Sequence, residues 1–178
     1  MHKVILVDDE KNVLHAVKRE LSFLTKADQS AFQISLDIFD SPVEALTYAK
    51  THPIDLVISD YRMPEMNGVD FLRNLNLIQP LTASIILSGQ ADMQAILRAI
   101  NEVGISRFVT KPWNDVELIT HVLEVLADIT IKRENKNLAD EMRKLLAGFE
   151  TAGDISPVHA ENIILDSSNL PVEKQQNT

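Results

Sequence analysis

Short apolar segments alternate with amphipathic segments five times along this chain, and this alternation constrains the fold more than any other feature. The apolar segments predict strands at residues 3–7, 32–39, 54–59, 84–87 and 108–110. Each is short and bounded by polar residues, as is typical of strands that are buried on both faces of a parallel sheet. Because connections between parallel strands are right-handed crossovers, the pattern predicts a doubly wound α/β fold. We expect a five-stranded parallel sheet of flavodoxin-like order 2-1-3-4-5.

The amphipathic segments between these strands predict helices that cover the sheet. One helix start has a complete signature: Ser41 is a good N-cap, Pro42 suits the first helical position, and Glu44 follows three residues after the cap. The other helices are predicted from apolar residues at helical spacing or from another polar N-cap residue. Helices are expected over about residues 13–24, from 42, from 68, over 92–102 and from the cap Asn114 onward.

The composition argues against several classes of function. The formal net charge is −9, which disfavours a surface that neutralises nucleic-acid phosphates, so direct nucleic-acid binding is not expected. The chain has no cysteine, which excludes disulfides, thiolate catalysis and cysteine-ligated metals. No apolar run approaches the roughly 18 residues of a membrane span, and no signal peptide precedes the first strand. We therefore expect a soluble, cytoplasmic protein with no membrane contact.

The last helix is expected to be longer than the sheet requires, because residues 114–146 contain neither Gly nor Pro. Its later part carries apolar and amide residues at alternating spacings of four and three, the pattern of a coiled-coil seam. Asn135 is the kind of buried polar residue that fixes the register of two parallel helices, although a helix end that folds back on its own domain is the other interpretation. The seam comprises Ile131, Asn135, Leu138, Met142 and Leu145.

These features divide the chain into three parts. Residues 1–127 are expected to form the α/β domain. Residues 128–147 form a helical extension, a candidate coiled coil and homodimer contact. Residues 148–178 are rich in Gly, Ser, Asp and Asn, a composition typical of a disordered tail.

Polar residues with related chemistry stand at the carboxyl ends of four of the predicted strands. Asp8 and Asp9 follow the first strand, Asp60 the third, Ser88 the fourth and Lys111 the fifth. In an open parallel sheet these ends meet at one edge, near the switch point between the first and third strands. Three carboxylates brought together favour a bound cation, and a donor set of oxygens favours Mg²⁺.

The same residue types are those needed to handle a phosphoryl group. A carboxylate serves as nucleophile, a divalent ion and a lysine neutralise the phosphoryl oxygens, and a hydroxyl donates a hydrogen bond. Taken singly, each residue is as readily a turn former or a helix cap. Their recurrence at successive strand ends favours the functional interpretation.

Four segments, VILVDDE, SDYRMPEMNGVDFL, IILSGQ and RFVTKPW, resemble in order and spacing the receiver domain of bacterial two-component response regulators. The resemblance covers about residues 1–127. It implies that Asp60 accepts a phosphoryl group, as an acyl phosphate, from a histidine kinase or a histidine phosphotransfer protein. It also implies that Asp8, Asp9 and Asp60 bind Mg²⁺ together with the backbone carbonyl of Arg62.

The resemblance implies roles for further residues. Ser88 and Lys111 would contact the phosphoryl oxygens, and in the family this lysine precedes a cis proline. Phe108 matches an aromatic residue whose rotation accompanies the switch, and Ser88 would take part in the same switch, although core packing explains Phe108 equally well. Arg62 and Gln90 match positions that flank the route of the attacking water, so they would tune the lifetime of the phosphate.

The segment RFVTKPW, with Ala-Ile-Asn-Glu before it, is most similar to receivers fused to HD-GYP phosphodiesterases or to hydrogenase-type transcription regulators. The chain departs from them after the long helix, because no HD or GYP residues, no ATPase P-loop and no helix-turn-helix pattern follow. The output activity of those relatives therefore cannot be transferred.

We expect a phosphoacceptor rather than an enzyme, one that assists its own Mg²⁺-dependent phosphotransfer and dephosphorylation. It would signal through protein contacts of its fourth helix, fifth strand and extended fifth helix, to a homodimer partner or an unknown downstream protein. One alternative is the receiver part of a longer regulator whose output domain is absent here. Another is a haloacid-dehalogenase-type phosphatase, which would need a second acid at the position of Arg62.

Overall fold

The computed structural model describes residues 1–25, 32–89 and 103–151. The helix expected at residues 92–102 lies outside the described residues, as do the tail from residue 152 and Gln90. The chain divides into two compact units, Met1–Lys132 and Arg133–Thr178.

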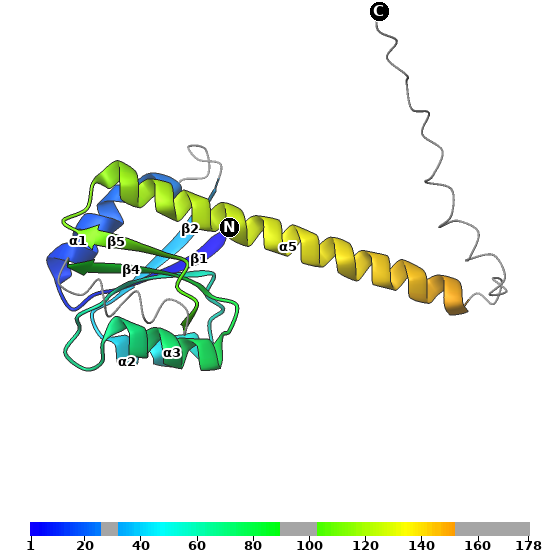
Figure 1. The fold of residues 1–178 in the computed structure, drawn as a ribbon, viewed down its shortest axis with the longest axis horizontal. Coiled ribbons are helices and arrows are strands. Elements are labelled where there is room, and N and C mark those ends of the chain that lie inside the picture. The colour runs from blue at the N-terminus through cyan, green and yellow to red at the C-terminus, as the bar shows by residue number, and fades with distance from the viewer. Residues whose placement is uncertain (26–31, 90–102, 152–178) are drawn as a thin grey trace, which may run out of the picture. The chain divides into compact units, whose positions relative to one another are not determined.

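Five parallel strands form one sheet in the first unit (Figure 1). The strand order is β2-β1-β3-β4-β5, which confirms the predicted doubly wound topology. The expected strand ends differ from the observed ones by at most two residues. The strands are β1 (His2–Val7), β2 (Ile34–Phe39), β3 (Leu56–Asp60), β4 (Ala83–Gly89) and β5 (Arg107–Lys111).

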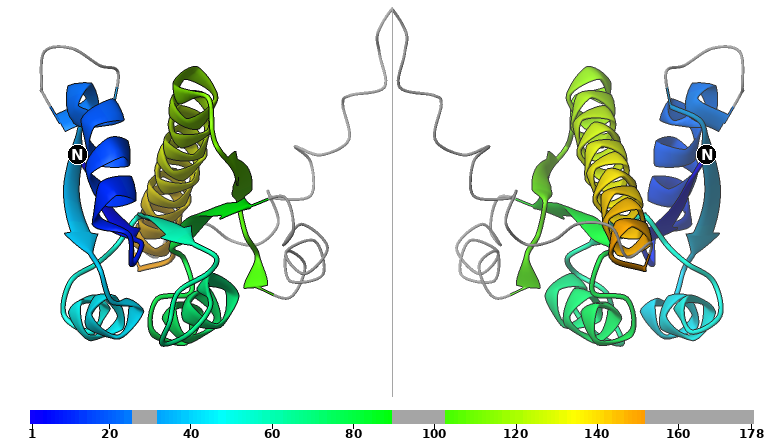
Figure 2. Two further views of the ribbon diagram at one scale, coloured as in Figure 1. Left: turned by 90° about the vertical axis from the view of Figure 1, so that its left-hand side faces the viewer. Right: turned by 90° about the vertical axis from the view of Figure 1, so that its right-hand side faces the viewer.

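Helices cover both faces of the sheet (Figure 2). Helix α1 and the first part of α5 pack on one face, and α2 and α3 pack on the other. The cap expected at Ser41 forms, since its side chain accepts a hydrogen bond from the backbone N–H of Glu44 at 3.4 Å. The described α-helices are α1 (Lys11–Glu20), α2 (Pro42–Ala49), α3 (Gly68–Ile78) and α5 (Asp115–Thr151).

The first helix is shorter than its apolar spacing predicts. Helix α1 ends at Glu20, and a 3₁₀ turn, Ser22–Thr25, continues the chain. Leu21 and Leu24 are both fully buried. Residues three apart lie on one face of a 3₁₀ turn, so the tighter turn directs both leucines onto the sheet.

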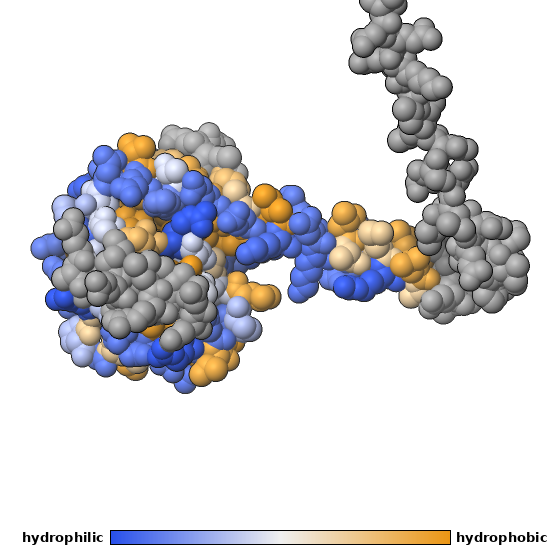
Figure 3. Space-filling view, in the orientation of Figure 1, coloured by the Kyte–Doolittle hydropathy of each residue, from blue (hydrophilic) through white to orange (hydrophobic). Residues whose placement is uncertain are grey.

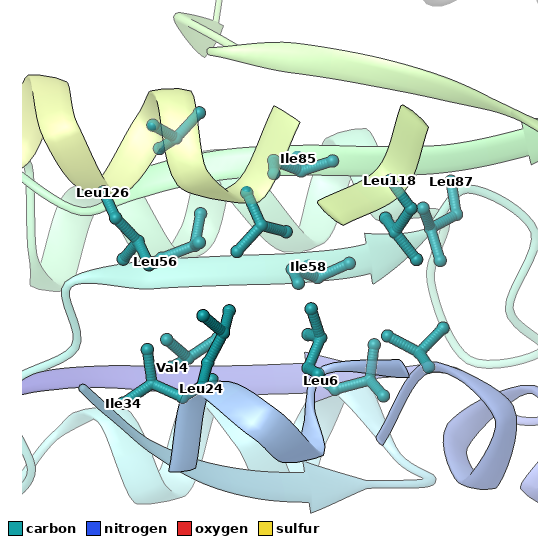
Figure 4. Packing of buried hydrophobic residues seen from close by; sticks show 14 of the residues in the cluster. Val4, Leu6, Leu24, Ile34, Leu56, Ile58, Ile85, Leu87, Leu118 and Leu126 are labelled. Atoms are coloured by element: carbon teal, nitrogen blue, oxygen red, sulfur yellow. The ribbon is translucent and has the colours of Figure 1, made fainter. Parts of the chain in front are cut away.

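Alternate residues of each strand point to opposite faces of the sheet, so their side chains belong to two separate hydrophobic cores. Val4 and Leu6 of β1 belong to the core beneath α1 and α5 (Figure 4), whereas Ile5 and Val7 belong to the core beneath α2 and α3. All four are fully buried. The two cores hold the strands in register, so that the carboxyl ends of β1, β3, β4 and β5 lie along one edge.

Helix α5 runs without a break through the whole of the predicted extension at residues 128–147. One side of its first part is buried, with Leu118 and Val122 fully inaccessible. In its later part hydrophobic side chains are exposed among hydrophilic ones (Figure 3). That these exposed hydrophobic side chains contact another helix stays a prediction. None of the described helices is long and apolar enough to cross a membrane.

Candidate functional site

Two buried carboxylates lie at the carboxyl ends of the neighbouring strands β1 and β3. Asp8 follows β1 and is fully buried, and its Oδ1 accepts a hydrogen bond from the backbone N–H of Glu10 at 2.8 Å. Asp60 is the last residue of β3 and is 5 % exposed. Its Oδ2 accepts a hydrogen bond from the backbone N–H of Arg62 at 2.6 Å. The pairing of β1 with β3 thus places both acids at the switch point of the sheet.

Lys111 joins these two carboxylates. It ends β5, and its Nζ lies 2.9 Å from Oδ2 of Asp8 and 2.5 Å from Oδ1 of Asp60. Strand β4 separates β5 from β3 in the sheet, so the long lysine side chain is needed to reach both acids. The Lys111–Pro112 peptide bond is cis, as the family resemblance implies.

The electrostatics of this group follow from its burial. Burial raises the pKa of Asp8, which outweighs the opposite effect of its hydrogen bond with Lys111. Burial alone would lower the pKa of Lys111, but its hydrogen bonds with Asp60 and Asp8 raise the pKa above the ordinary lysine value. Lys111 is therefore charged at neutral pH. One ammonium faces two carboxylates, which leaves a site that attracts a further cation.

Ser88 lies on β4, between the strands that carry Asp60 and Lys111. It pairs with Thr110 of β5, and only 1 % of its surface is exposed. Its hydroxyl donates a hydrogen bond to the carbonyl oxygen of Gly89 at 3.2 Å. The strand order therefore places a buried hydroxyl at the same edge of the sheet.

Comparison with known proteins identifies the family to which this arrangement belongs. The sequence profile of the response regulator receiver domain matches residues 4–123, about two thirds of the chain. The chain belongs to this family. It is a receiver domain of two-component response regulators.

Some relatives of this receiver are regulators much longer than the matched region. The chain is 29 % identical over 140 residues to the hydrogenase transcriptional regulatory protein HoxA of Cupriavidus necator. The matched region covers 79 % of this chain but 27 % of HoxA. The receiver thus spans about a quarter of the length of HoxA.

Solved structures show the same fold. An uncharacterized protein from Neptuniibacter caesariensis is 37 % identical with a TM-score of 0.65, over 75 % of this chain and 93 % of that chain. The signal receiver domain of an HD domain-containing protein from Pseudomonas fluorescens is 30 % identical with a TM-score of 0.64, over 75 % of this chain and 92 % of that chain. HoxA is a hydrogenase-type transcription regulator, one of the two kinds that the RFVTKPW segment resembles.

For three other residues expected at the receiver site, Asp9, Arg62 and Phe108, the structure gives the exposure or the packing of the side chain. Asp9 is exposed, unlike its buried neighbour Asp8, and Arg62 is exposed as well. Phe108 pairs with Ile86 of β4 and packs half-buried against the core beneath α2 and α3. The structure therefore brings Asp8, Asp60 and Lys111 together, and the roles expected for the remaining residues stay predictions.

The loop after Asp60 contains a residue that the sequence reasoning missed. A Cβ on Gly68 would lie 2.2 Å from the backbone carbonyl oxygen of Asp60, so only glycine allows this close approach. The N–H of Gly68 donates to the carbonyl oxygen of Tyr61 at 2.8 Å, and Asn67 caps α3 directly before it. An Asn-Gly pair is the sequence signal that could have revealed this turn. The start of α3 thereby closes the loop after Asp60 against the strand end.

The donor atoms at this edge suit a hard divalent cation. Asp8 and Asp60 present buried carboxylate oxygens whose charge Lys111 compensates only in part, and oxygen ligands are those that Mg²⁺ prefers. Within residues 1–25, 32–89 and 103–151, no three acidic or histidine side chains are grouped closely enough to form a metal site from side chains alone. Two carboxylates fit as the core of a magnesium site that needs further oxygen donors.

Proposed function

We propose that this receiver accepts a phosphoryl group on the side chain of Asp60, from the phosphohistidine of a histidine kinase or a histidine phosphotransfer protein. The observation that carries the proposal is the setting of this carboxylate. It is buried at a strand end, with one oxygen on the ammonium of Lys111 and the other on the backbone N–H of Arg62. These contacts hold the carboxylate in one orientation, as an effective nucleophile requires.

The chemistry follows from the groups at this edge. A carboxylate oxygen of Asp60 attacks the phosphorus, the bond from phosphorus to the histidine nitrogen breaks, and that nitrogen keeps the electron pair. Lys111 neutralises charge on the phosphoryl oxygens, and the hydroxyl of Ser88 turns from the carbonyl of Gly89 to donate to one of them. The receiver thereby assists its own phosphotransfer and later dephosphorylation, which fits a signalling domain rather than a classical enzyme.

Asp8, Asp9, Asp60 and the backbone carbonyl of Arg62 would hold Mg²⁺ at this site. When bound, the ion supplies positive charge to the oxygens of the incoming phosphoryl group. Asp9 is exposed directly after the buried Asp8, so its carboxylate is accessible to solvent ions. The excess negative charge of the pair formed by Asp8 and Asp60 supports the assignment.

Mg²⁺ is expected to change the emission of Trp113, the only tryptophan of the chain, which follows Lys111 by two residues and packs on the core. Asp8→Asn should weaken the apparent Mg²⁺ affinity at least about tenfold, because it removes one of the two buried anions. Fluorescence titration checks this. Asp55→Asn, directly before the start of β3, is the matched control and should titrate like the wild type. Equal affinities of wild type and Asp8→Asn would refute the magnesium assignment.

Phosphorylation would be passed on through protein contacts rather than through an enzymatic step. Ser88 and Phe108 are the proposed switch residues, and they lie on the paired strands β4 and β5, the latter being the last strand before α5 in the chain. The extended α5 would carry the change to a homodimer partner or to another protein, in the cytoplasm where histidine kinases present their phosphohistidine. The length of HoxA favours a second candidate, a receiver that serves an output domain of a longer regulator. The genomic reading frame decides between the two.

Arg62→Asn is expected to shorten the lifetime of the acyl phosphate several-fold. Arg62 is exposed two residues after Asp60, where a bulky side chain can shield the phosphoryl group from the attacking water. Decay of the phosphorylated protein, followed by intact mass, measures the effect. Arg73→Asn, which removes an exposed arginine from α3, is the control for the loss of surface charge. Equal lifetimes for all three proteins would remove the shielding role of Arg62.

A further inference from the structure

The later part of α5 exposes apolar residues at regular spacing, here called the stripe. Figure 3 shows hydrophobic patches among hydrophilic ones along this part of the helix. The apolar residues on the sheet-facing side of the first part of the helix are nearly inaccessible, with Val125 1 % exposed and Leu126 fully buried. Beyond them, Ile131 is 54 % exposed, Leu138 58 % and Leu145 65 %. An exposed apolar helix face such as this one is stabilised when a partner removes it from water.

The spacing of the stripe specifies a coiled-coil register. Leu138 and Leu145 fall at d positions, and Asn135 and Met142 fall at a positions. Leucine at d is typical of parallel two-stranded coiled coils. A single asparagine at a selects two strands and fixes their register, because its amide finds a partner only when it faces its own counterpart.

The charged residues that flank the seam distinguish a parallel from an antiparallel pair of helices. The g positions are Glu134 and Glu141, and the e positions of the next heptads are Ala139 and Leu146. In a parallel pair, each g residue faces the e residue of the following heptad on the partner, so each glutamate meets an uncharged side chain. An antiparallel pair would place g against g, glutamate against glutamate, and such like-charge contacts disfavour that orientation. It would also place Asn135 opposite a leucine.

We propose that a second copy of this chain covers the stripe, in a parallel and in-register pair of α5 helices in which Asn135 faces its counterpart. The inference deepens the proposed function, because it names the partner to which α5 passes the phosphorylation signal. It does not depend on the phosphoacceptor chemistry, so the two can fail separately.

The absence of cysteine from the chain allows a direct test of this pairing. In the full chain, Leu145→Cys places a thiol at a d position, where two identical residues of a parallel pair lie within the roughly 4–7 Å between Cα atoms that a disulfide requires. In the antiparallel register that pairs Leu145 with Asn135 the two thiols would be about 15 Å apart, since ten helical residues separate them. The matched control is Asp140→Cys, an f position on the outer face.

Under mild oxidation, Leu145→Cys should form a disulfide-linked dimer about a hundredfold faster than Asp140→Cys, because neighbouring thiols in a complex have millimolar effective concentrations. The wild-type chain should sediment as two copies. Equal cross-linking rates, or a monomeric wild type, would overturn the inference. Acetyl phosphate labelling of the same variants separates the two proposals. Labelling without cross-linking removes only the dimer, and cross-linking without labelling removes only the phosphoacceptor function.

Discussion

Asp60→Asn is expected to abolish phosphorylation while leaving the fold at least as stable as that of the wild type. The amide is not a nucleophile, but it has the shape of the carboxylate and keeps an oxygen to accept the hydrogen bond from the N–H of Arg62. The substitution also removes one of the two buried acids that share Lys111, which relieves their mutual repulsion. From the relief of this repulsion we expect a stability gain of up to about 1 kcal/mol.

Intact mass after incubation with acetyl phosphate and Mg²⁺ measures the loss, and urea unfolding measures the stability. Asp55→Asn is the matched control, because it removes a carboxylate that accepts a backbone hydrogen bond directly before the start of the same strand. That variant should be labelled like the wild type. Labelling of Asp60→Asn at the wild-type level would place the acceptor on another residue.

Lys111→Met is expected to lower the free energy of unfolding by about 3 kcal/mol at neutral pH, because it leaves the buried Asp8 and Asp60 without their shared cation. Without Lys111 the pKa of Asp8, already raised by burial, rises further. A raised acid pKa in the folded state means that stability returns as the pH falls through that pKa. Phosphorylation should be lost as well, since the phosphoryl oxygens lose their positive partner.

Chemical denaturation at several pH values tests this expectation, with the exposed Lys50→Met as control for the loss of one lysine. The double variant Lys111→Met with Asp8→Asn should recover most of the stability, because only one buried carboxylate then remains. Wild-type stability of Lys111→Met at neutral pH would show that the ion pairs of Lys111 have no structural role.

Much of the fold could be predicted from the sequence because each strand is a local apolar run and the handedness of the connections limits the topology. The meeting of Asp8, Asp60 and Lys111 followed from the same reasoning, since parallel strands end at one edge of the sheet. The 3₁₀ turn after α1 could not be predicted, because Leu21 and Leu24 fit a continuous helix equally well and only packing against the sheet decides between the two.

The detailed geometry of the site depends on contacts between segments far apart in the sequence. Asp8 and Asp9 are identical residues, and their different burial becomes visible only when β1 is placed in the sheet. Lys111 is 103 residues from Asp8, so no local pattern predicts that one ammonium bridges both acids. The need for glycine at position 68 arises in the same way, from the path of the chain over the carbonyl of Asp60.

The most direct measurement is to locate the phosphoryl group on the chain. The protein should be treated with acetyl phosphate and Mg²⁺, trapped by borohydride reduction of the acyl phosphate, digested and sequenced by mass spectrometry. Reduction confined to Asp60 is the expected result. Reduction at another carboxylate, or a stable phosphate on a serine or histidine, would contradict the assignment of Asp60 as the phosphoacceptor.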